Sequence, residues 1–245
     1  MGDLFRPKYH GVRLGALGIL LAFAPSAGAG IIADLSTDYA TGGFPSGWQF
    51  LRNTAAIGDS ANYTPLLWDA GNSRYDITGN SITGPNGAYT SLMNGGQIHP
   101  GQGIGQGAAF DGYTIAAYTI QSGEAGLVSI DGSLTGIDPD GATGSGANGW
   151  DLRIFVGNSQ AGGTLYFPWS MQPEAFSRAL GSLNAGDTVY VAVGPGSRDY
   201  YDSSLLAFQL ESTPQVPEPG MLSLVGLGLA ALWGHRRFRA RDRQR

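Results

Sequence analysis

Glycine and proline interrupt this chain so often that strands and turns are favoured over helices. The 245 residues include 40 Gly and 13 Pro, the two residues that cost most in the interior of a helix. The runs between them are short, and in several of them apolar and polar side chains alternate, as they do along a half-buried β-strand. The pattern predicts an all-β domain of short strands.

Eight segments carry the strand pattern. They span residues 47–51, 88–93, 113–120, 126–130, 150–156, 164–169, 188–193 and 205–210. Both faces of 113–120 are apolar or small, so we expect this strand to be covered on both sides. Residues 173–183 favour a helical turn. Eight short strands in about 180 residues predict a two-sheet, jelly-roll-like sandwich over residues 30–213.

The charge of the chain is divided unevenly between its centre and its ends. Residues 31–213 hold 5 Arg, no Lys and 16 Asp plus Glu, which gives 5 − 16 = −11. Such a domain repels phosphate backbones, so we expect no nucleic-acid partner. The chain has no Cys, which excludes disulfides, thiolate metal sites and cysteine nucleophiles.

The first segment, residues 1–29, has the features of a signal peptide. Basic residues up to Arg13 precede an apolar run at 14–24, which as a helix is about 16 Å long and too short for a ~30 Å hydrocarbon core. Ala27 and Ala29 supply the small-x-small pattern that signal peptidase accepts. We expect cleavage after Ala29, and a buried first helix is the alternative.

The last segment, residues 214–245, has three parts in a fixed order. A proline-rich motif, an apolar run and a basic end occupy residues 216–220, 221–234 and 235–245. The fourteen-residue apolar stretch reaches about 21 Å as a helix, which makes a short transmembrane helix. The arginine cluster stays on the cytoplasmic side and stops translocation.

This order resembles the PEP-CTERM sorting signal of Gram-negative bacteria. The matching residues are those of the motif and the start of the basic cluster: Val216, Pro217, Glu218, Pro219, Arg236 and Arg237. The resemblance implies export across the inner membrane, transient anchoring, and recognition and cutting by an exosortase, an integral-membrane protease. Proteins with this tail are commonly linked with exopolysaccharide and biofilm, at the cell surface or in the extracellular matrix. A plain single-span anchor is the alternative.

The central segment, residues 44–211, is similar to a jelly-roll module of exported PEP-CTERM proteins that itself resembles carbohydrate-binding modules. The segments that carry the similarity are 99–101, 113–120, 126–132 and 183–196. The resemblance implies a binding module and assigns no catalytic residues. The Gly-rich stretch 136–149 departs from the module and puts its usual ligand surface in doubt.

Aromatic residues in polar loops are the candidates for glycan contact, since sugar rings stack on aromatic faces while polar groups bond their hydroxyls. Tyr200 and Tyr201 with Arg198, and Trp68 beside Asp69, fit this description. The alternative is that these aromatic residues belong to the core, as we expect for those within strands.

A calcium site is the one cofactor that the sequence suggests. Asp138 and Asp140 lie one residue apart in a glycine-containing loop, which is a common way to present oxygen ligands, and Asp151 or Asn148 could add to this pair. A second acidic pair, Asp199 and Asp202, has a similar setting. The alternative in both places is a turn that binds nothing.

No catalytic set emerges from the sequence. Glu124, Glu174 and Glu211 are scattered, whereas glycoside cleavage needs two carboxylates several ångströms apart. His99 is the one histidine outside the terminal segments, so a catalytic triad would depend on it. We therefore predict a non-enzymatic protein. A polysaccharide-acting enzyme and a self-associating structural surface protein remain as alternatives.

Overall fold

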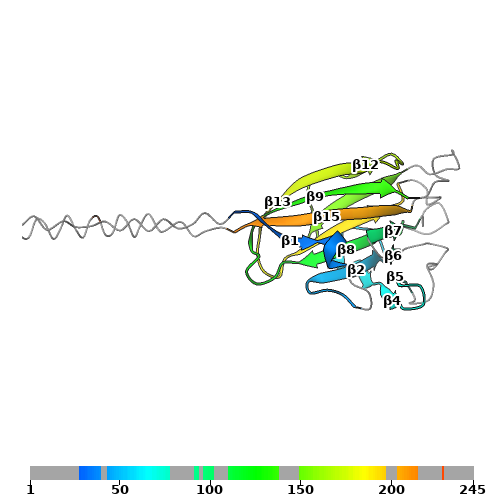
Figure 1. The fold of residues 1–245 in the computed structure, drawn as a ribbon, viewed down its shortest axis with the longest axis horizontal. Coiled ribbons are helices and arrows are strands. Elements are labelled where there is room, and N and C mark those ends of the chain that lie inside the picture. Colours follow the sequence, from blue (N-terminus) through cyan, green and yellow to red (C-terminus); the bar gives the residue numbers. More distant parts are fainter. Residues whose placement is uncertain are drawn as a thin grey trace, which may run out of the picture.

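The computed structural model of the protein describes residues 28–39, 43–77, 91–93, 96–101, 110–137, 149–196 and 203–214, together with Gly228. Over these ranges the chain forms two β-sheets that pack face to face around one apolar core (Figure 1). All the strand pairings among the described residues are antiparallel.

The larger sheet has eight strands, in the spatial order β13, β9, β15, β7, β6, β5, β4, with β1 beside β15. Their bounds are β1 (Gly30–Asp34), β4 (Leu67–Asp69), β5 (Arg74–Asp76), β6 (Ser91–Met93), β7 (Gln97–His99), β9 (Gly126–Gly136), β13 (Glu174–Leu183) and β15 (Ser204–Thr213). The helix α1 (Leu35–Asp38) follows β1 directly.

The smaller sheet has seven strands, in the spatial order β11, β10, β14, β8, β2, β3, with β12 beside β10. Their bounds are β2 (Trp48–Asn53), β3 (Tyr63–Pro65), β8 (Thr114–Thr119), β10 (Trp150–Val156), β11 (Ser159–Gln160), β12 (Leu165–Phe167) and β14 (Thr188–Gly194). A single 3-10 turn, η1 (Ser60–Asn62), precedes β3.

The all-β, two-sheet prediction is confirmed. Each of the eight segments that the sequence predicts as strands overlaps a strand of the structure, as β2, β6, β8, β9, β10, β12, β14 and β15. The prediction that 113–120 is covered on both sides is also confirmed. Ala116 and Tyr118 of β8 face the core between the sheets, while Ile115 and Ala117 face a second apolar cluster outside the smaller sheet.

The helical turn predicted for residues 173–183 is wrong, because this segment forms the ten-residue strand β13. The strand pairs with β9 from Glu174 to Leu183, with an irregularity between Ala179 and Gly181. Phe176 is buried against the main core. Pairing along β9 and the burial of one face outweigh the helix propensity of the local residues.

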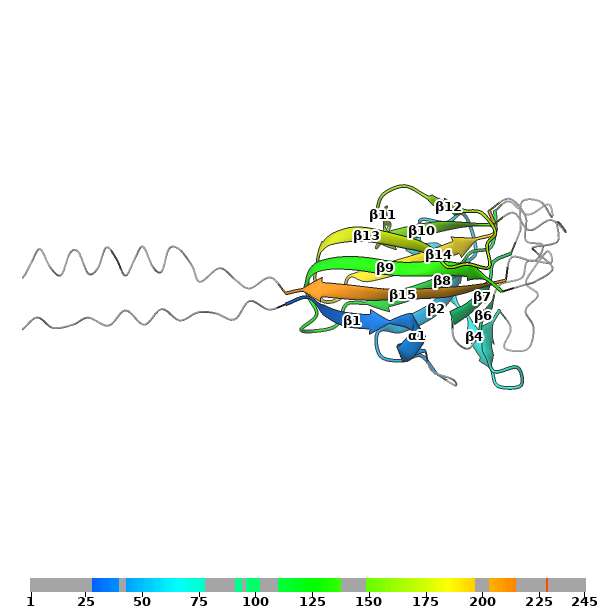
Figure 2. The ribbon, with the colours of Figure 1, turned by 45° about the horizontal axis from the view of Figure 1, so that its top comes forward.

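The described chain begins and ends at the same end of the sandwich (Figure 2). Gly30, the first residue of β1, pairs with Ser212 near the end of β15. The start of β15 lies at the opposite end, where Ser204 pairs with Ile98 of β7 and with Gly136 of β9. Residues 29 and 214 therefore leave the domain side by side.

Candidate functional site

Of the residues predicted to be recognised, to contact a glycan or to bind metal, three lie in the described part of the chain: Ala29, Trp68 and Asp151. Ala29 is exposed, directly before β1. The others lie outside the described residues: Ala27, Asp138, Asp140, Arg198, Tyr200, Tyr201, Val216, Pro217, Glu218, Pro219, Arg236 and Arg237. The second acidic pair, Asp199 and Asp202, also lies outside them.

Asp151 lies on β10 and is buried on the outer side of the smaller sheet. Its Oδ2 accepts hydrogen bonds from the Tyr113 hydroxyl and from Arg153 Nε, the latter at 3.0 Å. Its Oδ1 accepts a bond from the Gly196 N–H at 3.3 Å. Three donors thus satisfy the carboxylate, which links β10 to the residue before β8 and to the segment after β14. Whether it also binds calcium stays a prediction.

Tyr113 is held in place by the same cluster. The Arg153 guanidinium lies over its ring, 5.3 Å from the centroid. Burial, and next the negative charge of Asp151, raise the pKa of the Tyr113 hydroxyl well above its usual range. The hydroxyl therefore remains a neutral donor to the carboxylate at any physiological pH.

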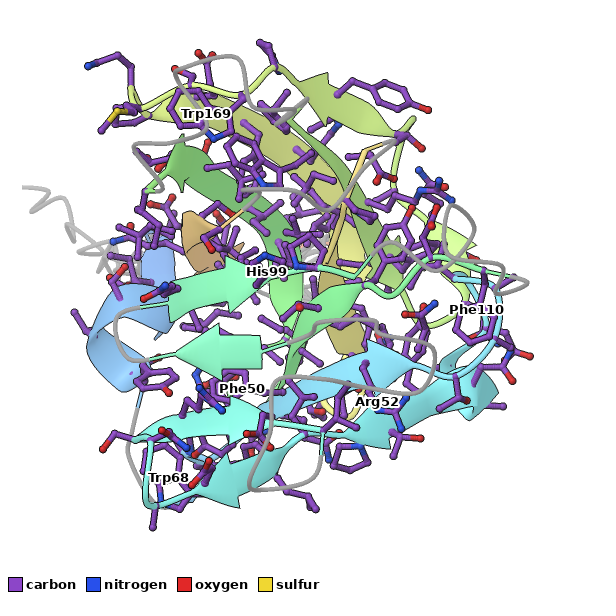
Figure 3. The ribbon with its side chains drawn as sticks, turned by 90° about the vertical axis from the view of Figure 1, so that its right-hand side faces the viewer. Phe50, Arg52, Trp68, His99, Phe110 and Trp169 are labelled. Carbon is purple, nitrogen blue, oxygen red and sulfur yellow. The ribbon has the colours of Figure 1, made fainter. Side chains whose placement is uncertain are left out.

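Trp68 lies on β4 and packs inward. Its ring meets that of Tyr75 edge to face at a centroid distance of 5.0 Å, and it packs against the main core. Figure 3 shows it at one edge of the sandwich, far from Trp169. The half-buried indole thus already has an aromatic partner. Whether it also contacts a glycan stays a prediction.

The turn between β4 and β5 holds two buried carboxylates around one arginine. Arg74 Nε lies 3.2 Å from Asp76 Oδ2, and an Arg74 terminal nitrogen lies 3.9 Å from Asp69. Asp69 also accepts bonds from the Asn72 side chain at 2.6 Å and from two backbone N–H groups of the turn. The Asn72 bond is the main reason that the pKa of Asp69 lies below its usual value.

The side chains considered for catalysis lie apart in the structure. The two carboxylate oxygens of Glu124 share the hydroxyl proton of Tyr118, and Oε2 also accepts the Gln121 N–H, so Glu124 closes a turn after β8. Glu174 opens β13, opposite Leu134 of β9. His99 lies on β7, where its carbonyl accepts a bond from Thr114. Within the described ranges, no group of three His, Asp or Glu side chains is arranged to hold a metal ion.

A groove of about 300 Å³ opens on the outer face of the larger sheet. Its polar lining comes from Asp34 and Ser36 at the start of α1, Asp131 and Ser133 of β9, and Gln209 of β15. The register explains how these distant residues meet, since Gln209 pairs with Asp34 on one side and with Asp131 on the other. The alternation along β9 could have placed Asp131 and Ser133 outward, but not beside Asp34.

The polar atoms of this groove are mostly acceptors. Asp34 Oδ1 caps α1 by accepting the Ser36 N–H at 2.9 Å, and its Oδ2 accepts Gln209 Nε2 at 2.8 Å. Because the amide nitrogen of Gln209 is used in this bond, the side-chain oxygen of Gln209 is its remaining hydrogen-bonding group and can only accept. The carboxylate of Asp131 is exposed and forms no hydrogen bond or ion pair with a described residue. The groove is thus negatively charged.

Several solved structures match the chain at low sequence identity and low structural similarity. One match is the M60 catalytic domain with the CBM51-1 and CBM51-2 domains of ZmpB from Clostridium perfringens: 10% identity, 76% of this chain, 15% of that chain, TM-score 0.35. A second is an exo-β-1,3-galactanase from Phanerochaete chrysosporium: 11% identity, 66% and 27% coverage, TM-score 0.29. A third is the GH26-CBM35 β-(1,4)-mannanase of Podospora anserina: 19% identity, 44% and 20% coverage, TM-score 0.25. This chain thus spans 15% to 27% of the length of these three proteins.

The comparison with curated proteins finds no match. None of the helices in the described ranges has the length and apolar composition needed to cross a membrane; nearly all of the predicted membrane segment, 221–234, lies outside those ranges. A family model described as the PEP-CTERM protein-sorting motif matches residues 215–237. The chain therefore carries a PEP-CTERM sorting motif, which implies an exported protein of a Gram-negative bacterium that an exosortase processes at the membrane.

Proposed function

We propose that this is a non-enzymatic protein of the cell envelope or extracellular matrix, whose sandwich domain associates with exopolysaccharide in a biofilm. The observation that carries the proposal is the sorting motif at residues 215–237. In this proposal residues 1–29 are a signal peptide, residues 30–213 are the functional domain, and residues 214–245 are the tail that directs the domain to the cell envelope.

Both ends of the described chain leave the domain on one side, which supports an orientation with that side toward the membrane. The pairing of Gly30 with Ser212 brings both ends of the described chain together. Seven residues, 214–220, separate the sandwich from the predicted membrane helix, and they reach at most about 25 Å. Before cleavage the domain would stand close to the bilayer, with the start of β15 pointing away from it.

The strand order supports the finer description of the domain as a jelly roll. From β7 to β10, and again from β13 to β15, successive strands alternate between the two sheets. In the larger sheet β7, β15, β9 and β13 are neighbours, and in the smaller sheet β8, β14 and β10 are neighbours. Two sheets connected in this alternating way are the double-sheet architecture of jelly rolls.

The environment of the described carboxylates supports a role without catalysis. Asp69, Asp76 and Asp151 are buried and bonded to arginine or turn donors, and Glu124 closes a turn. These are structural roles of carboxylates.

Calcium binding at Asp138 and Asp140 is tested by thermal unfolding with Ca²⁺ and with EDTA, where stabilisation by Ca²⁺ is the expected result.

Mass spectrometry of the mature protein from its host tests the sorting part of the proposal. We expect a species that begins at Gly30 and ends between Pro217 and Pro219. Changing Pro217 and Glu218 together to Ala should leave the tail uncut, while the control Tyr166→Ser, at a remote residue that is 75% exposed, should be processed normally. Recovery of the intact tail in the unaltered protein would instead indicate a plain membrane anchor.

Retention on polysaccharide affinity gels tests the binding part. We expect the protein to be retarded, and the Tyr200→Ala, Tyr201→Ala double variant to be retarded less. Release of shorter sugars from the polysaccharide would favour the enzyme alternative. Concentration-dependent self-association without retardation would favour a purely structural protein.

A further inference from the structure

The groove on the outer face of the larger sheet is built to receive hydrogen-bond donors. Two carboxylates, Asp34 and Asp131, flank the side chain of Gln209. The amide nitrogen of Gln209 is already used by Asp34 at 2.8 Å, so its free oxygen adds a third acceptor. The hydroxyls of Ser36 and Ser133 complete the polar lining and can donate or accept hydrogen bonds.

The charge of this face excludes an anionic ligand and favours a cationic one. Among the described residues that line the groove there is no Arg or Lys. The three described arginines other than Arg52 bond to Asp69, Asp76, Asp151 or the Ser177 carbonyl. An anionic sugar would therefore meet uncompensated carboxylates. The −11 charge of residues 31–213 would also attract a cationic polymer over some distance.

A bare metal ion is a poorer fit than an organic cation. Calcium takes six to eight oxygen ligands that converge at about 2.3–2.6 Å, whereas this groove is open and holds about 300 Å³. In the described part of the chain no cluster of three acidic or histidine side chains is present. The volume lies at the lower end of the range for small-molecule pockets, about 300–1,000 Å³.

We propose that this groove binds amino-sugar units of a partly or fully deacetylated polysaccharide, with the ammonium group at Asp131 and ring hydroxyls at Gln209 and Ser133. Asp131 is suited to the ammonium because its carboxylate is exposed and has no partner of its own among the described residues. The inference deepens the proposed association with exopolysaccharide by naming the sugar class and the face that receives it.

Isothermal titration of the full-length chain in detergent with two matched probes tests this assignment. The probes are oligomers of β-1,4-linked glucosamine and the same oligomers fully N-acetylated. We expect the glucosamine oligomer to bind and the acetylated one to bind at least tenfold more weakly, since acetylation removes the charge. Equal binding of the two probes would overturn the proposal.

Two charge-neutralising variants separate the groove from the general acidity of the domain. Asp131→Asn should weaken glucosamine binding about tenfold or more, because a bond to a charged group is lost. Glu211→Gln lies on the same strand as Gln209, opposite Ser129 and outside the groove, and should change binding less than twofold. Equal losses in both variants would show nonspecific attraction and overturn the assignment.

Unchanged unfolding midpoints of both variants would confirm that the domain is intact, as expected for side chains that are not buried. The same preparation should also be applied to polysaccharide affinity gels. Retention on an uncharged polysaccharide without glucosamine binding would overturn this inference and leave the proposed function standing. Loss of retention on every gel would instead contradict the proposed function.

Discussion

The outer faces of the two sheets differ in what covers them. The outer face of the smaller sheet is apolar along its central strands, with Leu51, Ile115, Phe155 and Ala192 in one buried cluster. The loop between β2 and β3 places Ile57 against this cluster, and Tyr63, the first residue of β3, also packs against it. The outer face of the larger sheet instead presents Ser129, Asp131 and Ser133 of β9, and Ala207 and Gln209 of β15, none of them buried.

This difference separates stability from binding. An apolar face stabilises the fold only when it is covered. The smaller sheet is therefore packed on both of its faces. Around Gln209 the outer face of the larger sheet consists of small and polar residues that need no cover, which leaves room for the groove. The exposed leucines of this face, Leu127 and Leu205, do not line the groove. Substitutions on the covered face should therefore lower the unfolding free energy of the domain, while substitutions on the open face should leave it nearly unchanged.

The largest effect is expected for Phe155→Ala on the covered face. Phe155 is 3% exposed in the outer cluster, and removing a buried phenyl ring costs about 3–5 kcal/mol of unfolding free energy. The matched change on the open face, Leu127→Ala, removes a side chain that is 54% exposed and should cost less than about 0.5 kcal/mol. Urea denaturation measures both, and similar losses would contradict the comparison.

A somewhat smaller effect is expected for Asn53→Ala, which removes the hydrogen bonds between the end of β2 and the segments beside it. Asn53 Nδ2 donates to the Ala55 and Asp111 carbonyls at 2.7 and 2.8 Å, and Oδ1 accepts the Tyr113 N–H at 2.6 Å. Losing these buried bonds should cost about 2–3 kcal/mol. Gln49→Ala, at an exposed residue of the same strand, is the control. A cost below 1 kcal/mol for Asn53→Ala would mean that water replaces the amide.

Tyr113→Phe should have an effect of about 1–2 kcal/mol, because one of three donors to the buried Asp151 carboxylate is lost. Thermal unfolding at pH 7 measures it against Tyr166→Phe, whose ring is 75% exposed. If Tyr166→Phe lost as much stability as Tyr113→Phe, the hydrogen bond to the buried carboxylate would not be the cause of the effect.

The smallest effect is expected for Asn72→Ala at the β4–β5 turn, and it should depend on pH. Asn72 lowers the pKa of Asp69, so it stabilises the fold above the ordinary carboxyl pKa of about 3.9. That stabilisation disappears as the pH falls through the lowered pKa. The variant should therefore differ from the unaltered protein more at pH 7 than at pH 3. A difference that grows toward acid would contradict this.

Much of the strand content could be predicted because alternation is a local property. The β8 sequence has no polar face, and it is covered on both sides as predicted. The segment that became β13 has residues that also favour helix, and only pairing with β9 decides its conformation. The short strands β4 and β5 carry three residues each, too few for a periodic signal.

The candidate sites divide in the same way. The sorting motif is a linear signal, and the sequence was sufficient to recognise it. The sequence predicts Asp151 as a metal ligand. Its bond to Arg153 is local to β10, but its bond to Tyr113 depends on how β10 and β8 lie on either side of β14. The role of Trp68 likewise depends on its pairing with Tyr75.

The sequence by itself determined the all-β class, the acidity of the domain and the sorting tail, because each of these is written in neighbouring residues or in composition. Only the tertiary structure decided which sheet face is covered, and that Asp34, Asp131 and Gln209 line one groove. These three residues are up to 175 positions apart. Their meeting depends on the register of β1, β15 and β9, and register is fixed by long-range pairing and burial.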